Sequence, residues 1–189
     1  MRIGIFGGTF DPPHVGHLIV ASDAFAVLGL DRLILVPSAD PPHKQGQVAA
    51  TAGQRLEMVR AAVRDDPRFE VDDIELKRAG ASYSVDTLRE MRVRFPDAEI
   101  FFLVGMDQMR ELHSWREPHE VARLACLSVI ARDGDEPDPD TPFRFRLVPV
   151  TRIDLSATDI RSRIAGGESV RYLVPDAVRE IIEREGTYR

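Results

Sequence analysis

Two histidines near the amino terminus stand where a strand is expected to give way to a helix. Residues 1–6 are mostly apolar without helical spacing, which predicts a short buried strand, and two glycines follow it. From Val15 onward the apolar residues recur at helical spacing, so His14 and His17 would share one face of the first turn. The free N–H groups at a helix N-terminus favour an anion, and imidazole groups can donate to one. The stretch therefore points to phosphate chemistry.

Neither of the two common phosphate-binding loops is present in this stretch. It lacks GxxxxGK followed by Ser or Thr, and it lacks GxGxxG. The run GGTFDPPHVGH, residues 7–17, instead resembles the bacterial nicotinate mononucleotide adenylyltransferases, which belong to the nucleotidylyltransferase superfamily with the HxGH motif. The resemblance implies that His14 and His17 are catalytic. It also implies that ATP contacts the turn at Gly7, Gly8, Thr9 and Phe10.

Two other interpretations of the histidine pair are open. A zinc site has little support, because two histidines without a further ligand at metal spacing do not complete one. Cys126 is the single cysteine, and we expect it to be buried and unrelated to the histidines. An ordinary strand, turn and helix with two surface histidines is the second alternative, and the match over the whole motif disfavours it.

A second candidate anion site lies near the carboxyl-terminal end. Ser156 followed three positions later by Asp159 resembles a capping box, so a well-capped ordinary helix is one interpretation. In the other, the hydroxyl groups of Ser156 and Thr158, the helix N–H groups and Arg161 face a triphosphate. The superfamily has ISSTxIR here, and the resemblance assigns Arg161 a catalytic role. Ala157 replaces the second serine of that motif, which removes one hydroxyl.

An acidic residue just beyond another buried strand is a candidate for recognising a sugar. A carboxylate accepts two hydrogen bonds well, as from the hydroxyl groups of a ribose. The family pattern is GxD, assigned to the adenosine ribose, and it matches Gly105 and Asp107. Alternatively, Asp107 caps a helix over residues 108–112.

The acceptor substrate is assigned to three residues through the same resemblance. Trp115, the single tryptophan, stands among polar residues, and its flat face can stack on a pyridine ring. The family stacks this tryptophan on nicotinate and uses the next N–H, here that of Arg116, for the carboxylate. Ser84 stands in YSVDTL where the family has YTxDTL, which implies a backbone contact to the same carboxylate. From the residues alone, Ser84 is only a helix N-cap.

Two basic residues in loops complete the expected ATP site. Lys44 follows the second strand in a segment rich in Pro and Gly, and the resemblance places it near the phosphates. A solvated surface lysine is an equal alternative. Arg132, which follows the strand expected over residues 124–131, matches a family position near the adenine, which its guanidinium can cover.

Composition excludes several classes of protein. The chain has 189 residues, 43% hydrophobic and 30% charged, as in globular proteins. With 25 basic and 31 acidic residues its net charge is −6, which argues against general nucleic-acid binding. It has no apolar run long enough for a membrane span and begins with a strand rather than a signal peptide. We therefore expect a cytoplasmic protein, in agreement with the single cysteine.

Strand and helix patterns alternate along the chain, which predicts an α/β fold with a parallel sheet, and the resemblance implies that this fold is of the nucleotidylyltransferase type. This is a Rossmann-like open parallel sheet with helices on both faces. We expect one domain over residues 1–189, with a helical part from about 156 to 189 packed on it. The strands are expected at residues 1–6, 32–37, 69–74, 99–104, 124–131 and 145–150.

The resemblance implies that the phosphate of nicotinate mononucleotide attacks the α-phosphorus of ATP in the presence of Mg²⁺. The products would be nicotinate adenine dinucleotide and pyrophosphate, in NAD biosynthesis. No residue is assigned as a metal ligand. The open alternatives are another acceptor, either phosphopantetheine or nicotinamide mononucleotide, and a non-catalytic nucleotide sensor. Whether the chain forms a homo-oligomer is also open.

Overall fold

A six-stranded parallel sheet forms the centre of the protein. The computed structural model describes residues 1–40, 48–78, 80–131 and 141–189. The strand order is β3-β2-β1-β4-β5-β6, and every neighbouring pair is parallel. The order reverses between β1 and β4, and ligands of open α/β sheets bind outside the carboxyl ends of strands at such a point. The strands are β1 (Arg2–Gly8), β2 (Arg32–Pro37), β3 (Phe69–Val71), β4 (Glu99–Gly105), β5 (Cys126–Ala131) and β6 (Phe145–Pro149).

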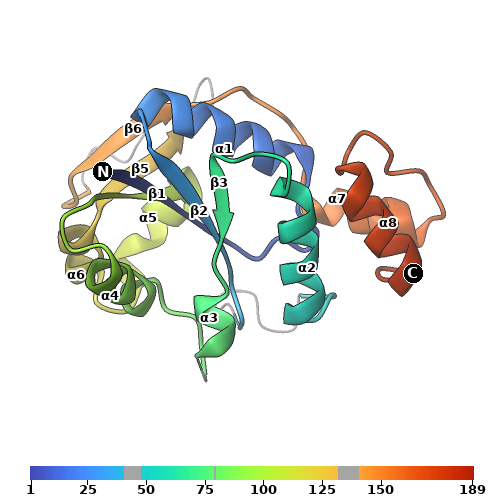
Figure 1. The fold of residues 1–189 in the computed structure, drawn as a ribbon, viewed down its shortest axis with the longest axis horizontal. Coiled ribbons are helices and arrows are strands. Elements are labelled where there is room, and N and C mark those ends of the chain that lie inside the picture. The colour runs from blue at the N-terminus through green and yellow to red at the C-terminus, as the bar shows by residue number, and fades with distance from the viewer. Residues whose placement is uncertain (41–47, 79, 132–140) are drawn as a thin grey trace.

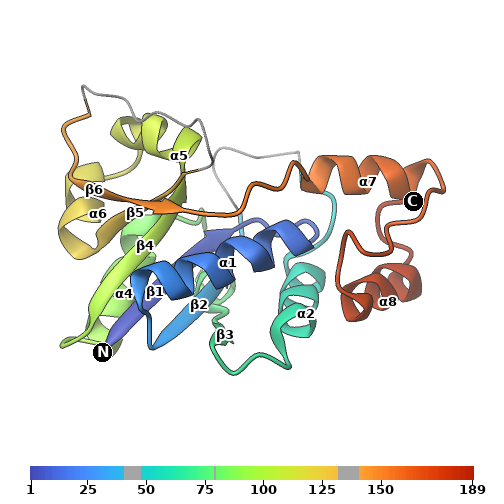
Figure 2. The ribbon, with the colours of Figure 1, turned by 90° about the horizontal axis from the view of Figure 1, so that it is seen from above.

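Helices cover both faces of this sheet, as Figures 1 and 2 show, which confirms the predicted fold class. Along β4, Phe101 and Leu103 pack with α1 (Val15–Leu28) and α2 (Ala52–Val63) on one face. Ile100 and Phe102, which alternate with them, pack on the opposite face. Both faces of the strand are therefore buried, as expected in a parallel sheet. The helices of the second face are α3 (Ile74–Lys77), α4 (Ser84–Arg94), α5 (Met106–Glu111) and α6 (Pro118–Leu124), with the 3₁₀ turn η2 (Leu112–Ser114).

The carboxyl-terminal helices α7 (Ala157–Ala165) and α8 (Asp176–Glu185) lie beside α2, away from the sheet (Figure 1). A separate apolar cluster joins them to α2, in which Met58 contacts a group that includes Ile160 and Val178. Arg184 on α8 also pairs with Glu57 on α2 at 2.7 Å. The end of the chain also lies next to the turn that follows β1, where the Tyr188 hydroxyl donates to the Asp11 carboxylate.

The predictions about the end of β3, the start of β5 and the burial of Cys126 were wrong. The strand expected to reach residue 74 ends at Val71, because the Asp72 carboxylate accepts the N–H of Ile74 at 3.0 Å and α3 begins there. The strand expected from Leu124 begins at Cys126, because α6 continues through Leu124. Cys126 is exposed rather than buried, since it is the first residue of its strand.

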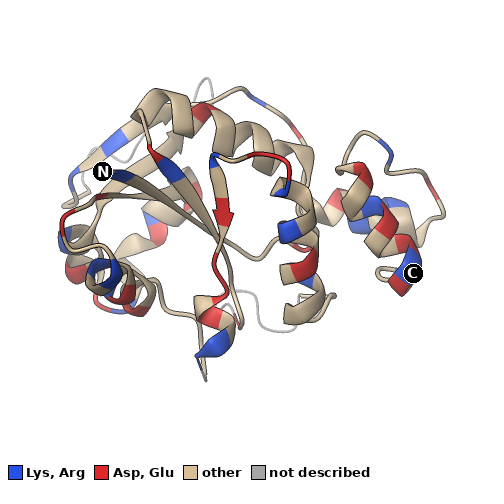
Figure 3. Cartoon of the chain, viewed as in Figure 1, with Lys and Arg blue, Asp and Glu red and all other residues tan. Residues whose placement is uncertain are grey.

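In the view of Figure 3, Lys and Arg are mixed with Asp and Glu on the helices rather than gathered on one element. Within the part of the chain that the structure describes, no helix is long and apolar enough to cross a membrane.

Candidate active site

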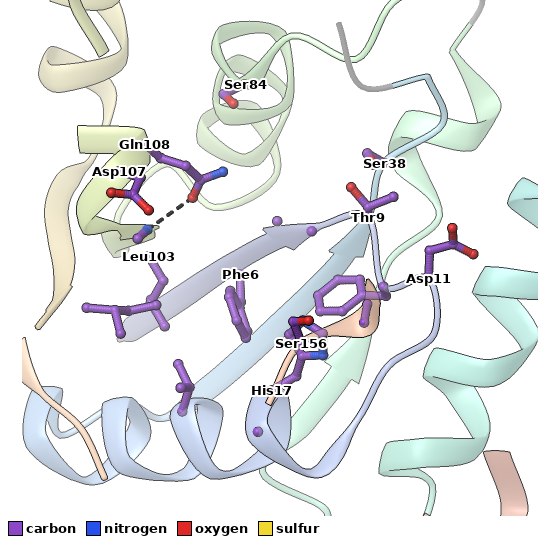
Figure 4. A pocket seen from close by; sticks show the side chains of 18 of the residues that line it. Phe6, Thr9, Asp11, His17, Ser38, Ser84, Leu103, Asp107, Gln108 and Ser156 are labelled. Atoms are coloured by element: carbon purple, nitrogen blue, oxygen red, sulfur yellow. Dashed lines mark hydrogen bonds between the residues drawn. The ribbon is translucent and has the colours of Figure 1, made fainter. Parts of the chain in front are cut away.

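A pocket of about 760 Å³ opens at the carboxyl ends of β1 and β4, at the point where the strand order reverses. Figure 4 shows His17 and Ser156 together at one end of it, with Asp107 and Gln108 across the cavity. Every predicted site residue that the structure describes lines this pocket. These are Gly7, Gly8, Thr9, Phe10, His14, His17, Ser84, Gly105, Asp107, Trp115, Arg116, Ser156, Thr158 and Arg161. Lys44 and Arg132 lie outside the described residues.

The two histidines form a stacked pair at the start of α1. Their ring centroids are 3.7 Å apart and their planes differ by 29°. The Nδ1 of His17 accepts the backbone N–H of His14 at 3.2 Å, so a neutral His17 carries its proton on Nε2. The Phe10 ring meets His17 edge-on, with centroids 5.0 Å apart. The two rings lie together as predicted, but His14 is the extended N-cap that precedes α1 rather than a residue of its first turn.

The glycines around the histidines serve packing as well as ligand access. A Cβ on Gly8 would lie 2.8 Å from the Phe10 ring, so the Gly8 position is filled by that ring. A Cβ on Gly7 would meet nothing closer than 4.0 Å, which leaves this position accessible as predicted. A Cβ on Gly16 would lie 3.0 Å from Nδ1 of His14. Gly8 and Gly16 thus keep the phenyl and imidazole rings in place.

A second helix N-terminus, that of α7, faces the same pocket. Ser156 is its N-cap: its hydroxyl accepts the N–H of Asp159 at 3.1 Å and donates to the Asp159 carboxylate at 2.6 Å. This confirms the predicted capping box. Nη2 of Arg161 donates to the Thr158 hydroxyl at 3.3 Å, and its Nη1 donates to the carbonyl of Asp11 at 2.9 Å. Two helix ends with partial positive charge therefore converge on one cavity.

The opposite wall carries the residues predicted for the acceptor. Trp115 is half-buried and meets Phe102 edge-on, with ring centroids 6.4 Å apart. The Arg116 guanidinium lies over the Tyr83 ring, 4.9 Å from its centroid. The expectation that Ser84 caps α4 was wrong, because the extended residue Tyr83 holds the N-cap position and Ser84 begins the helix.

Asp107 lies at the rim of the pocket and is almost fully exposed. The alternative that it caps a helix was wrong, because α5 begins one residue earlier with Gly105 as the N-cap. The Gln108 side chain accepts the N–H of Gly105 at 3.0 Å and completes that cap. Asp107 instead pairs with Arg110 at 3.1 Å.

Sequence reasoning missed a buried polar centre behind the turn between β1 and α1, which is the predicted phosphate turn. Arg55 on α2 is 1% exposed and donates to the carbonyls of Thr9 at 2.7 Å and Ala39 at 3.1 Å. Burial lowers the pKa of Arg55, and the nearby Asp11 carboxylate partly offsets this. Asp11 could have been noticed inside the GGTFDP run, but the helical pattern gave no sign that Arg55 is buried.

Glu75 is a second residue that the sequence did not reveal. It lines the pocket, is 8% exposed and accepts a hydrogen bond from the Thr87 hydroxyl at 2.7 Å. Burial raises the pKa of Glu75, and the hydrogen bonds from Thr87 and Ser82 act in the opposite direction. The Ser82 hydroxyl also accepts the N–H of Ala39 at 2.9 Å, which ties the end of β2 to the segment before α4.

Known proteins are similar in sequence to this chain over its full length. A family model described as cytidylyltransferase-like matches residues 5–163. A Thermus thermophilus protein named probable nicotinate-nucleotide adenylyltransferase is 48% identical over 189 residues, covering 100% of both chains. A Desulfitobacterium hafniense protein of the same name is 42% identical over 198 residues, covering 100% of this chain and 96% of its own. The chain belongs to the nicotinate-nucleotide adenylyltransferase family.

The family membership confirms the resemblance seen in GGTFDPPHVGH. A solved structure of Plasmodium falciparum nicotinic acid mononucleotide adenylyltransferase complexed with NaAD has the same fold, with a TM-score of 0.82. Its sequence is 16% identical, and the match covers 99% of this chain and 97% of that one. The fold is thus retained where most side chains differ.

Proposed function

We propose that the protein transfers the adenylyl group of ATP to nicotinate mononucleotide, giving nicotinate adenine dinucleotide and pyrophosphate in NAD biosynthesis. The observation that carries the proposal is that all predicted site residues within the described part of the chain line one pocket. Full-length identity to nicotinate-nucleotide adenylyltransferases supports it.

The chemistry requires positioning and charge stabilisation more than covalent participation of the protein. The acceptor phosphate is already ionised, so it attacks the α-phosphorus without a general base. His17 would donate through Nε2, and the stacked His14 lies beside it. Arg161, held on the carbonyl of Asp11, would stabilise the charge that develops on the departing pyrophosphate. The N-terminal ends of α1 and α7 add to the same positive field.

Magnesium is proposed to enter as a complex with ATP. No three carboxylate, imidazole or thiol groups among the described residues lie together as a metal site. Mg²⁺ commonly binds substrate phosphates and water with few protein ligands, which fits this set of residues. When bound, the ion neutralises phosphate charge. The residues of the chain hold the triphosphate and orient it.

The two substrates are proposed to meet at the centre of the pocket. Trp115 would stack on the pyridine ring, and the backbone N–H groups of Ser84 and Arg116 would bind its carboxylate. Asp107, at the rim of the pocket, would accept hydrogen bonds from the adenosine ribose. Lys44 and Arg132 keep their expected roles near the phosphates and the adenine.

The partners are proposed to be these two small molecules rather than a nucleic acid, in agreement with the net charge of −6. A cytoplasmic location is proposed as well, supported by the presence of a single cysteine.

The deciding experiment measures pyrophosphate release from ATP and Mg²⁺ with three acceptors in parallel: nicotinate mononucleotide, nicotinamide mononucleotide and phosphopantetheine. We expect a strong preference for nicotinate mononucleotide. A preference for phosphopantetheine would support the roles of His14 and His17 but contradict the proposed contacts of Ser84, Trp115 and Arg116 with nicotinate. No release with any acceptor, alongside measurable ATP binding, would indicate a nucleotide sensor.

A further inference from the structure

The carboxyl-terminal tail reaches the phosphate turn through one side chain. The Tyr188 hydroxyl, one residue from the end of the chain, donates to Oδ1 of Asp11 at 2.7 Å. Tyr188 itself adopts a left-handed backbone with φ of 70°, which is unfavourable for an aromatic residue and needs surrounding contacts to hold it. Its ring packs on the apolar cluster that joins α2, α7 and α8. The tail is therefore seated against the turn.

Three neutral donors occupy the Asp11 carboxylate, which is 3% exposed. Besides Tyr188, the N–H of Ala49 donates to Oδ2 at 2.8 Å and the N–H of Ala50 donates to Oδ1 at 3.0 Å. Burial, together with the bond to Asp11, raises the pKa of Tyr188. The phenol therefore stays protonated, and remains a donor, at any pH near neutrality.

Arg161 lies close enough to compete for the same carboxylate. Its Nη1 is 3.8 Å from Oδ2 of Asp11, which is longer than a hydrogen bond, while the same nitrogen donates to the Asp11 carbonyl at 2.9 Å. A guanidinium prefers a bidentate contact with a carboxylate when both oxygens are accessible. With the carboxylate occupied, Arg161 keeps its place on the carbonyl and faces the pocket.

We propose that Tyr188 is a positioning residue that occupies Asp11 and so keeps Arg161 available to the triphosphate. The inference rests on the proposed function, because it assigns Arg161 to the departing pyrophosphate. Tyr188 does not line the pocket itself, so its effect must pass through Asp11 and Arg161. Without the Tyr188 hydroxyl, Oδ1 of Asp11 keeps one donor, the N–H of Ala50, and we expect the carboxylate to draw in Arg161, whose Nη1 already lies 3.8 Å from Oδ2.

The test compares Tyr188→Phe with Tyr172→Phe, which removes a hydroxyl from an exposed tyrosine of the same carboxyl-terminal segment, also with positive φ. We expect Tyr188→Phe to lower kcat about tenfold, as for loss of one hydrogen bond to a charged group, and to change KM for nicotinate mononucleotide less than about twofold. Tyr172→Phe should match the wild-type enzyme in both constants.

A double-mutant cycle separates this role from a merely structural one. In an Arg161→Ala background, Tyr188→Phe should lower kcat by less than about twofold, because the residue it acts through is gone. The same tenfold loss in both backgrounds, or no loss in the wild-type background, would overturn the inference. If Tyr188→Phe unfolds at the assay temperature, the double-mutant cycle is repeated at low temperature with the affinity for pyrophosphate as the readout. Tyr188→Phe should then weaken pyrophosphate binding in the wild-type background and have little effect in the Arg161→Ala background.

The wild-type enzyme is assayed first, so the two proposals fail separately. Absence of turnover in the wild type contradicts the proposed function. Normal turnover with an unaffected Tyr188→Phe variant contradicts only the role of Tyr188.

Discussion

The imidazole rings of His14 and His17 stack with their centroids 3.7 Å apart, directly at the N-terminus of α1. The hydrogen bond from the His14 N–H to Nδ1 of His17 fixes which nitrogen of the second ring carries the proton. Nε2 of His17 is thereby a donor before any ligand arrives. This arrangement favours a charge that develops on phosphate oxygens during the reaction.

His17→Ala should lower kcat roughly 100-fold to 1000-fold, which is the usual effect of removing one preorganised donor to a transition-state charge. ATP affinity, measured by calorimetry, should change far less, because the N-terminus of α1 and the backbone at Gly7 and Gly8 remain. His113→Ala is the matched control, since His113 is exposed and binds only the carbonyl of Arg110 among the contacts described. A His17→Ala variant with unchanged kcat would remove the residue from catalysis.

Gly16→Ala should disturb catalysis without destabilising the fold. The added Cβ would lie 3.0 Å from Nδ1 of His14, so the ring must shift by a few tenths of an ångström. We expect kcat to fall about 10-fold to 100-fold, while the higher helix propensity of alanine offsets the local strain. Steady-state kinetics and thermal unfolding measure the two effects.

Gly53→Ala is the reference for that experiment, because a Cβ at this exposed position in α2 meets nothing within 4 Å. It should leave kcat unchanged and raise the free energy of unfolding by about 0.5 kcal/mol. Equal kinetic losses in both variants would show that the contact with His14 is not responsible.

The residues that sequence reasoning located share one property: they lie in contiguous motifs whose local structure the motif itself determines. Ser156 and Asp159 are an example, because the capping box needs only residues three positions apart. The parallel sheet was predictable for a similar reason, since continuous apolar runs are typical of strands buried on both faces.

Most of the features that were missed depend on contacts between distant parts of the chain, and one depends on a local side-chain contact. Asp11 and Tyr188 are 177 positions apart, and no pattern in either segment indicates that they meet. Arg55 follows a helical pattern in which a charged residue is expected to face solvent, yet the turn carbonyls draw it inward. The early end of β3 was missed because the Asp72 side chain competes with the sheet for a backbone N–H.

Glu75 should make stability depend on pH in the direction opposite to that of most carboxyl groups. Burial raises the pKa of the Glu75 carboxyl group above its ordinary value of 4.5. The folded protein therefore binds the carboxyl proton more tightly than the unfolded chain does. The resulting stabilisation is fully present below the unfolded pKa and is lost as the pH rises through the folded value. Urea unfolding at a series of pH values measures it.

Glu75→Gln should remove this dependence, so the variant should gain stability relative to the wild-type protein as the pH rises. Glu180→Gln, at an exposed position of α8, is the matched control and should follow the wild-type curve. Parallel curves for all three proteins would contradict a raised pKa at Glu75.

Trp115→Ala should weaken binding of the acceptor and leave ATP nearly unaffected. Loss of a stacked aromatic contact, together with the buried area of the indole, corresponds to an increase of about 10-fold in KM for nicotinate mononucleotide. Trp115→Phe retains a flat ring that can still meet Phe102 edge-on, so its KM should rise only about twofold to threefold. Thermal unfolding of both variants separates the packing of Trp115 on the core from its effect on substrate. Because Asp107 and the turn between β1 and α1 line the same pocket as Trp115, an equal rise in KM for ATP would mean that Trp115 supports the whole cavity rather than the acceptor alone.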